Sequence, residues 1–536
     1  MMKKLFLWSA LLMTGFAFYS CDDAIDNPVT GKQDPSNPNA TWTYEVSVKF
    51  DKAQTYWDGE TQYKFEAPQT LYVFNQNREQ LGVITCNEKI DQDNYAEDYY
   101  KFAGTLKGAI GDTLIIGTIE DPSTWFGEKQ DGTLATIFKN GILELAKAPI
   151  IVTNTSTGKI GTQNVKLQNC TFILGMLMSQ YATGKEKYIT ITSDAIMIPE
   201  KTMTVTFAEG VDLKDKFWVA YPILKGINSQ YFFKTTSEDG VDLFAKWDGS
   251  TLNPGEIDWI WWVNMWPKTI DLKKHVERFG NWIYISIDDL TITQSGDEAI
   301  DCSLQIYANG VTLKGINIKN SYFYVGLPSS KSKENTIIIE GENKISSNNW
   351  SWTVMSTSYP LTLKGNGTLS LTATYDYAYG IYIGDYTQYE IDEDNSVAIP
   401  ASLTIEEGVT VKVKAKDVGV FAGSMKGNSY SYKEDGKWKE KTADENFENS
   451  LIINGTLEAE GDNQGVYKVG KILVAETGVL KATSNNAWQK ILDATIKEPS
   501  DANNWAEAAL ETLVADKSKF SDETSEDKKV RTIKKK

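Results

Sequence analysis

The chain has 536 residues and a formal net charge of −18. Proteins that bind nucleic acid or anionic membrane surfaces need basic patches, so this charge argues against both as partners. The length predicts three or four domains, and a hydrophobic share of 41% is enough to give them cores. Arginine occurs only at positions 78, 278 and 531, which argues against bidentate capture of phosphate or carboxylate groups as the main function.

Residues 1–20 have the pattern of a signal peptide, with lysines at positions 3 and 4 and an apolar run over 5–18. The segment closes on Phe18-Tyr-Ser-Cys21, which resembles the lipobox of Bacteroidetes-type lipoproteins, although Phe stands where Leu is usual. The resemblance implies lipidation at Cys21 and anchoring to the outer membrane. Acidic residues at 22 and 23 resemble the signal for display at the cell surface. The alternative is a cleaved secretory signal in which Cys21 is an ordinary thiol.

Residues 21–41 are rich in Pro, Asn, Asp and Gly and are predicted to be a flexible tether. The remaining cysteines, Cys86, Cys170 and Cys302, are widely spaced and odd in number. They cannot form a full disulfide framework, so we expect buried thiols.

Two β-sandwich units are predicted next, over 42–149 and 150–257. In the first, apolar and polar residues alternate over 43–50, and further strands are expected at 70–74, 99–102 and 112–117, with a short helix or strand over 140–147. In the second, strands are expected at 164–167, 171–177, 188–192, 203–207, 217–221 and 231–235. The run Phe217-Trp-Val-Ala-Tyr-Pro222, followed by a strand and Leu252-Asn-Pro-Gly255, resembles fimbrillin-like proteins of the same bacteria. The resemblance implies a surface-displayed module that sits in or beside a fimbria.

An aromatic junction or cap is predicted over 258–282, because Ile257–Trp266 holds four tryptophans in eight residues. Such a cluster is either a packed joint or a sugar-stacking surface. A large exposed apolar patch is an aggregation hazard, which favours the joint. His275, the only histidine, is expected to be a surface or joint residue.

A repeated sequence governs residues 283–485. Each copy of the repeat, which we call a word, predicts two short strands around a glycine turn. The copies are Leu361-Thr-Leu-Lys-Gly-Asn-Gly-Thr-Leu, Leu403-Thr-Ile-Glu-Glu-Gly-Val-Thr-Val, Leu451-Ile-Ile-Asn-Gly-Thr-Leu and Ile472-Leu-Val-Ala-Glu-Thr-Gly-Val-Leu. Three copies are followed by a glycine-aliphatic-aromatic strand, at Gly380, Gly419 and Gly465. Such units must stack to bury their apolar faces, which predicts a parallel β-helix with Leu363, Leu371, Ile405, Val413 and Ile453 inside. The alternative is a β-sandwich with similar hairpins.

The spacing of the words is roughly 21 to 24 residues without insertions and 42 to 48 with them, and insertions in repeats usually gather on one face. Residues 283–485 resemble the carbohydrate-binding β-helical domains related to pectate lyases. The predicted fold class is therefore all-β, with tandem β-sandwich units followed by a right-handed parallel β-helix. Residues 486–536 are expected to form a C-terminal cap, with helical spacing over 505–514, and a frayed charged tail.

The motifs of several enzyme classes are missing: one histidine excludes a His-Glu-x-x-His zinc site, and no Gly-x-Ser-x-Gly or P-loop occurs. A Ca²⁺-dependent polysaccharide lyase or glycoside hydrolase on the β-helix stays an alternative. Its Ca²⁺ would bind carboxylates of the first insertion, Asp385, Asp392 and Asp394. The competing interpretation is a solvated acidic loop without metal.

Carbohydrate binding needs exposed aromatic faces and a few hydrogen-bonding groups. The insertions supply aromatic residues on successive coils, and the candidates are Trp350, Trp352, Tyr377, Tyr379, Tyr386, Tyr389, Tyr430, Tyr432 and Trp438. The sequence thus predicts a non-catalytic, surface-anchored polysaccharide-binding protein. The alternatives are the Ca²⁺-dependent enzyme and a fimbria-associated adhesin for fimbrial or other surface-protein partners.

Overall fold

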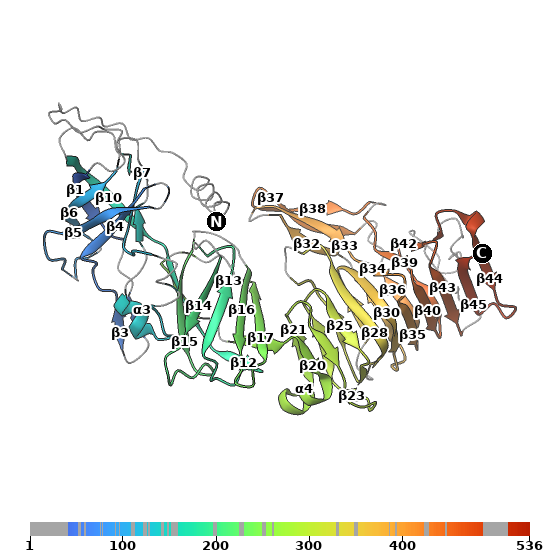
Figure 1. The fold of residues 1–536 in the computed structure, drawn as a ribbon. Coiled ribbons are helices and arrows are strands. Elements are labelled where there is room, and N and C mark those ends of the chain that lie inside the picture. Colours follow the sequence, from blue (N-terminus) through green and yellow to red (C-terminus); the bar gives the residue numbers. More distant parts are fainter. Residues whose placement is uncertain are drawn as a thin grey trace. The chain divides into compact units, whose positions relative to one another are not determined.

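The computed structural model describes residues 41–536 apart from 52–54, 58–60, 76, 78, 92, 96, 109–112, 122–125, 127–128, 141–143, 147–149, 152–158, 197–200, 224–229, 249–252, 254, 260–261, 329–331, 348–351, 385, 392–393, 423–427, 445–446 and 486–512. The chain divides into two compact units, the first ending at Trp266 and the second beginning at Pro267. Each is built mainly of strands (Figure 1), in agreement with the all-β prediction. Within the described residues, no helix is long and apolar enough to cross a membrane.

The first sheet of unit 1 closes on itself. Its order is β4-β5-β6-β1-β10-β8-β7-β9, and β4 also pairs with β7. Alternate residues of β1, among them Tyr44, Val46 and Val48, are buried in its core, as the alternation predicts. The strands are β1 (Thr41–Lys49), β4 (Thr70–Phe74), β5 (Gln80–Cys86), β6 (Tyr99–Lys107), β7 (Thr113–Gly117), β8 (Glu144–Ala146), β9 (Ile150–Ile151) and β10 (Lys159–Asn169), and β2 (Thr55–Trp57) pairs separately with β3 (Gln62–Lys64).

Strand β10 lies in this first sheet, although residues 164–167 are predicted to belong to the second sandwich. It pairs parallel with β1, Val48 opposite Val165. Such a pairing joins segments that are far apart in the chain, and alternation within one strand does not indicate its partner. The predicted limit at residue 150 therefore does not follow the strand pairing.

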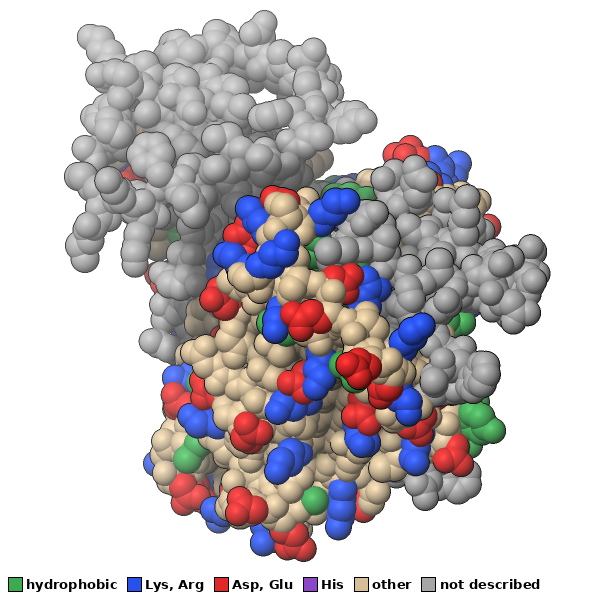
Figure 2. Space-filling view, turned by 90° about the vertical axis from the view of Figure 1, so that its right-hand side faces the viewer, with side chains coloured by type: hydrophobic (Ala, Val, Ile, Leu, Met, Phe, Trp, Pro, Cys, Tyr) green, Lys and Arg blue, Asp and Glu red, His purple; other side chains and the backbone are tan. Residues whose placement is uncertain are grey.

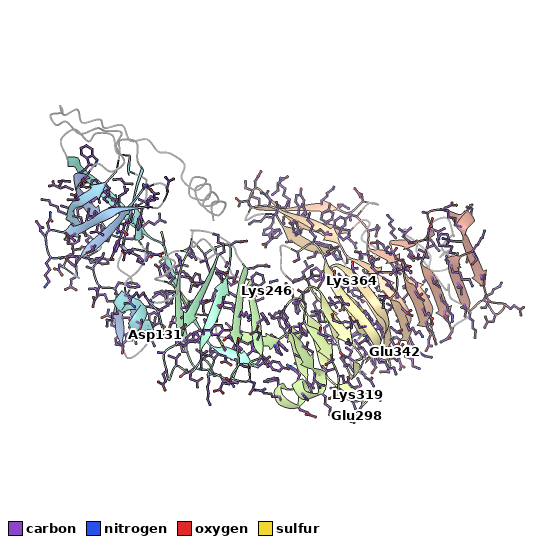
Figure 3. The ribbon with its side chains drawn as sticks, viewed as in Figure 1. Asp131, Lys246, Glu298, Lys319, Glu342 and Lys364 are labelled. Atoms are coloured by element: carbon purple, nitrogen blue, oxygen red, sulfur yellow. The ribbon has the colours of Figure 1, made fainter. Side chains whose placement is uncertain are left out.

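Two further sheets surround the second core of unit 1, in the orders β15-β11-β18 and β12-β19-β17-β16-β13-β14. Helix α3 (Leu134–Asn140) packs its Leu134, Ile137 and Phe138 into this core, and Asp131 at its start (Figure 3) accepts a hydrogen bond from Thr133 N–H. The strands are β11 (Thr171–Met176), β12 (Met178–Gln180), β13 (Tyr188–Thr192), β14 (Thr202–Thr206), β15 (Phe217–Pro222), β16 (Gln230–Thr236), β17 (Asp242–Asp248), β18 (Ile257–Trp259) and β19 (Val263–Pro267).

The aromatic stretch supplies the strands β18 and β19, which pair parallel with β11 and β12. Trp266 is 1% exposed, and its ring lies 5.8 Å from that of Tyr181, whereas Trp262 is 68% exposed. Trp261 lies outside the described residues. Part of the stretch is thus core of unit 1, and Trp262 faces solvent.

Unit 2 begins earlier than the predicted start near residue 283. Strand β20 (Thr269–Asp271) already pairs parallel with β22 (Thr291–Thr293). Helix α4 (Leu272–Phe279) follows β20, with the Asp271 carboxylate accepting from Lys274 N–H at its N-terminus. His275 on α4 is 2% exposed, and its ring lies 5.0 Å from that of Phe279, so of the two expected placements, surface or joint, the surface one is wrong. Burial lowers the pKa of His275 to about 4.

Two ladders of parallel strands make up the body of unit 2 (Figure 1), which we call the parallel stack. The shorter ladder follows the order β21-β24-β27-β29-β31-β36-β41, and the longer follows β20-β22-β25-β28-β30-β35-β40-β43. Their strands, with the side pairings β23, β26, β34, β39 and β42, are β21 (Trp282–Ile285), β23 (Ile300–Asp301), β24 (Ser303–Ile306), β25 (Val311–Lys314), β26 (Asn317–Lys319), β27 (Phe323–Val325), β28 (Asn335–Ser346), β29 (Thr353–Thr357), β30 (Pro360–Thr372), β31 (Tyr379–Ile383), β34 (Ser402–Ile405), β35 (Thr410–Ala415), β36 (Val418–Ala422), β39 (Ser450–Ile453), β40 (Thr456–Gly461), β41 (Gln464–Tyr467), β42 (Lys471–Val474) and β43 (Val479–Ser484).

The repeated words lie in register in the parallel stack. Leu363 pairs with Ile405, which pairs with Ile453, and all three are buried. Leu371 and Val413 are register partners and also buried, so the predicted inward positions are confirmed. Intervening side chains point outward: Lys364, labelled in Figure 3, follows Leu363 and is exposed.

The repeated glycines mark close approaches between successive strands of the shorter ladder. A Cβ added to Gly380 would lie 2.6 Å from the carbonyl oxygen of Gly419, and one on Gly419 would lie 2.5 Å from that of Gly465. The glycine of the word is required because the next strand's backbone occupies the space of a side chain.

The C-terminal residues form a hairpin, so the predicted frayed tail is wrong. Strand β45 (Val530–Lys535) pairs antiparallel with β43 and with β44 (Phe520–Thr524), which follows the 3₁₀ turn η2 (Lys517–Lys519). Phe520 and Ile533 are buried, and Arg531 makes two hydrogen bonds of 2.9 and 2.8 Å to Asp522. Figure 2 looks onto this side of the molecule, where acidic and basic side chains are interspersed. The predicted helix over 505–514 lies largely outside the described residues.

Candidate functional site

The two insertions rise side by side, as the sequence predicts for loops that follow equivalent strands. The first follows β31 and is the hairpin β32 (Tyr386–Glu390) and β33 (Ser396–Pro400); the second follows β36 and is β37 (Ser429–Glu434) and β38 (Lys437–Thr442). Their turns are in contact: Gly436 N–H donates to the Asp394 carbonyl oxygen at 2.9 Å, and Asp435 N–H to Asn395 Oδ1 at 3.2 Å. We call this pair of hairpins the arm.

Several aromatic candidates join the two hairpins of the arm rather than face solvent. The Tyr430 ring stacks on Phe447 at 4.0 Å, and Tyr386 packs against both rings. The Tyr386 hydroxyl also accepts a hydrogen bond from Ser431 N–H at 3.1 Å. These rings hold the arm together, which makes Tyr386 and Tyr430 poor candidates for ligand contact.

The remaining aromatic residues of the arm differ in exposure. Trp438 is 63% exposed, Tyr432 is half-buried, and Tyr389 is half-buried with the Lys333 ammonium 4.8 Å from its ring centroid. Trp438 is therefore the large aromatic of the arm with the greatest access to solvent.

Three rings form an aromatic corner where β30 ends and β31 begins. Trp352 lies just before β29, and Tyr375 and Tyr377 lie in the connection between β30 and β31. Tyr375 is edge-on to both other rings, with centroids 6.4 Å away in each case. Trp352 and Tyr377 are each 66% exposed, so their faces are open to a ligand. Trp350, predicted with them, lies outside the described residues.

A polar column continues from the aromatic corner along the stack. Asp417 N–H donates to the Ala378 carbonyl oxygen, and Asn463 N–H donates to that of Asp417, so these residues occupy the same corner on the next two strands. The amide of Asn463 donates to one Asp417 carboxylate oxygen at 2.6 Å. Tyr379 lies beside this column, and burial, with a smaller effect of Asp417, raises the pKa of its hydroxyl. The corner thus combines open aromatic faces with a hydrogen-bonded carboxylate and amide from neighbouring strands.

A second set of rings lies on the outer face of the shorter ladder, at the aromatic position of the glycine-aliphatic-aromatic repeat. Tyr382, Phe421 and Tyr467 are register partners on β31, β36 and β41. Tyr379 stacks on Phe421 at 4.6 Å with an interplanar angle of 12°, and Tyr382 is nearly parallel to Phe421 at 5.7 Å. Because these rings face one another along the stack, they stabilise the ladder and present mainly edges to solvent. The sequence signal for this row of rings is the repeated glycine-aliphatic-aromatic strand, whose aromatic side chain points outward.

The predicted Ca²⁺ site lies largely outside the part of the chain that the structure describes. Asp385 and Asp392 lie outside that part, and Asp394 is exposed at the turn of the first hairpin. No group of three or more metal-ligating side chains occurs among the residues that the structure describes.

No protein-family model matches the chain, and no curated protein matches it. Solved structures similar to it include a candidate cell adhesion protein of Bacteroides ovatus, with 10% identity, 42% of this chain and 96% of that chain covered, and a TM-score of 0.22. The tip fimbrial protein Mfa3 of Porphyromonas gingivalis has 12% identity, coverages of 40% and 84%, and a TM-score of 0.17. A candidate adhesin of Bacteroides ovatus has 12% identity, coverages of 44% and 88%, and a TM-score of 0.19. These values mark a loose likeness.

Proposed function

We propose that this protein is a non-catalytic, adhesin-type binding protein of the cell surface, and that unit 2 binds a polysaccharide at the aromatic corner. The observation that carries the proposal is the pair of open rings, Trp352 and Tyr377, next to the Asp417–Asn463 column. Aromatic faces pack against the C–H surfaces of sugars, and carboxylate and amide groups bind their hydroxyls.

The parallel stack supports an extended ligand. Equivalent positions on successive strands repeat at about 4.8 Å, so a polymer that lies along the stack meets the same kind of position at each step. We propose that the stack is a right-handed parallel β-helix, as the resemblance to pectate-lyase-related domains implies.

Lipidation at Cys21 would hold the chain at the outer membrane, with the tether leading to unit 1. A Cys21→Ala variant should move from the membrane fraction to the soluble fraction after cell lysis. Retention of this variant in the outer membrane would contradict the lipid anchor.

The binding test uses the soluble Cys21→Ala chain on a glycan array, followed by titration of the glycans that bind. Trp352→Ala and Tyr377→Ala should each weaken binding about fivefold, because a stacked ring contributes about 1 kcal/mol beyond its burial. Trp282→Ala is the matched control: Trp282 is 69% exposed but lies on β21, three strands from β29 in the shorter ladder. Its removal should leave affinity unchanged.

The outcomes separate the candidates. Equal binding by the Trp352→Ala variant and the control refutes the aromatic corner as the site. If the protein releases unsaturated uronate products and a chelator abolishes this release, the protein is a Ca²⁺-dependent lyase and the proposal of non-catalytic binding is wrong. Absence of binding to every glycan would refute the polysaccharide ligand and favour an adhesin for protein partners.

A further inference from the structure

Among the residues that the structure describes, strand β38 pairs only with β37, so it is an open edge of the arm. It belongs to a two-stranded sheet with β37, and all six of its residues, Lys437–Thr442, are exposed. On the other side of β37, the first hairpin supplies hydrogen-bond partners: Ser431 N–H donates to the Tyr386 hydroxyl, and Lys433 N–H donates to Ser396 Oγ at 2.8 Å. The first hairpin therefore covers β37 and leaves β38 at the border of the arm (Figure 1).

The pairing register shows which backbone groups of β38 face outward. Ser431 is opposite Glu440, and Lys433 is opposite Trp438. Because the N–H groups of Ser431 and Lys433 point away from β38, these two are non-hydrogen-bonded pairs of the antiparallel ladder. The N–H and C=O groups of Trp438 and Glu440 consequently point to the open side, two residues apart, in the arrangement that an added strand requires.

The side chains of β38 favour one kind of strand. Lys437, Lys439 and Lys441 alternate along one face, and of these Lys439 forms an ion pair with Glu434. The whole chain carries a net charge of −18, so three lysines in five residues are a local exception. A second β38 would place lysines opposite lysines, which destabilises the pair, whereas an acidic strand would form opposite-charge pairs. Trp438, on the other face, is an exposed aromatic anchor of the kind enriched in binding hot spots.

We propose that β38 binds an extended acidic segment of a partner protein, which joins the arm as an added strand beside Trp438 and Glu440. The backbone hydrogen bonds supply the register, the lysines select acidic side chains, and the Trp438 ring covers an apolar side chain of the bound segment. This surface is independent of the aromatic corner, so its loss would leave polysaccharide binding unchanged.

The test uses a fluorescent eight-residue peptide of alternating valine and aspartate, measured by anisotropy against the soluble Cys21→Ala chain. Glu440→Pro removes one outward N–H while keeping the hydrogen bonds of β38 to β37, and should weaken binding at least tenfold. Glu440→Ala is the matched control, since it keeps the N–H; it should bind as well as the parent or better, because an acidic side chain is lost. Lys437→Glu should weaken binding and reduce its salt dependence.

Hydrogen exchange gives a second readout that does not depend on a variant's fold. Saturating acidic peptide should slow exchange at the Trp438 and Glu440 amides, and a peptide with lysine in place of aspartate should not. Equal binding of the Glu440→Pro and Glu440→Ala variants would overturn the proposal, as would equal binding of acidic and basic peptides. Self-association of the parent chain that Glu440→Pro abolishes would also overturn it, since the occupant would then be a second copy.

Discussion

Leu363 offers a direct test of the register of the parallel stack. Its side chain is fully buried between its register partners Ile337 and Ile405, which are fully buried as well. Truncation to alanine removes apolar groups whose transfer is worth about 0.8 kcal/mol per CH₂. The ladder hydrogen bonds on both sides prevent the neighbours from closing the gap, so a cavity term adds to this, and Leu363→Ala should destabilise unit 2 by about 3 kcal/mol.

The assay is scanning calorimetry of the soluble Cys21→Ala chain. For a unit of this size, 1 kcal/mol corresponds to roughly 2–4 °C, so the transition of unit 2 should shift down by roughly 6–12 °C. Lys364→Ala, at the next and exposed position of β30, is the control and should change stability by less than about 0.5 kcal/mol. If unit 2 unfolds at the same temperature in both variants, Leu363 does not point inward and the register of β30 is wrong.

Three further predictions concern other parts of unit 2. The pKa of His275, about 4, lies below the usual value of about 6.5, so the unfolded chain takes up a proton first as pH falls. The contribution of His275 to the free energy of unfolding should be fully present well above pH 6.5 and lower by about 1.4 kcal/mol at pH 5.5. His275→Leu should remove this part of the pH dependence in thermal melts, and an unchanged pH dependence in that variant would contradict the prediction. Asp522→Asn leaves the buried Arg531 without its carboxylate and should cost about 2 kcal/mol, seen as faster hydrogen exchange in β45; unaltered exchange would show that the ion pair is dispensable. Gly419→Ala places a methyl group against the Gly465 backbone and should cost about 1–3 kcal/mol in chemical denaturation, and a neutral effect would mean that the strands separate easily.

The sequence was most informative where the chain repeats itself. Leu361, Leu403, Leu451 and Ile472, chosen as the starts of equivalent words, are register partners in the structure. Repetition reveals non-local pairing because equivalent residues of neighbouring coils lie opposite each other. The same reasoning placed both insertions on one side, where the arm is found.

Elsewhere the local sequence pattern did not indicate with which other strand a segment pairs. The alternation of β10 predicts a strand but not its pairing with β1, and the charged sequence of β44 and β45 resembles a tail although Phe520 and Ile533 are buried. Each strand of this hairpin buries only one apolar side chain, so the sequence has little apolar periodicity to detect.

The candidate site was predictable in composition but not in exposure. Trp352, Tyr377 and Trp438 are exposed, whereas Tyr386, equally plausible in sequence, packs inside the arm. Whether a ring faces solvent depends on residues such as Phe447 that approach from another part of the chain. No spacing rule within an insertion contains that information.

The antiparallel end of the parallel stack has a consequence for how the chain matures. Each strand of the parallel ladders can dock on the preceding one soon after it emerges, whether from the ribosome or across a membrane, since its partner strand is already present. Strand β43 is the exception, because the residues opposite Ala482 and Leu480 on its far side are Arg531 and Ile533. Until they arrive, β43 presents an unpaired edge on which other unfinished chains can pair. Chains cut short before residue 530 should therefore aggregate or be degraded even though every earlier strand of the parallel stack is intact.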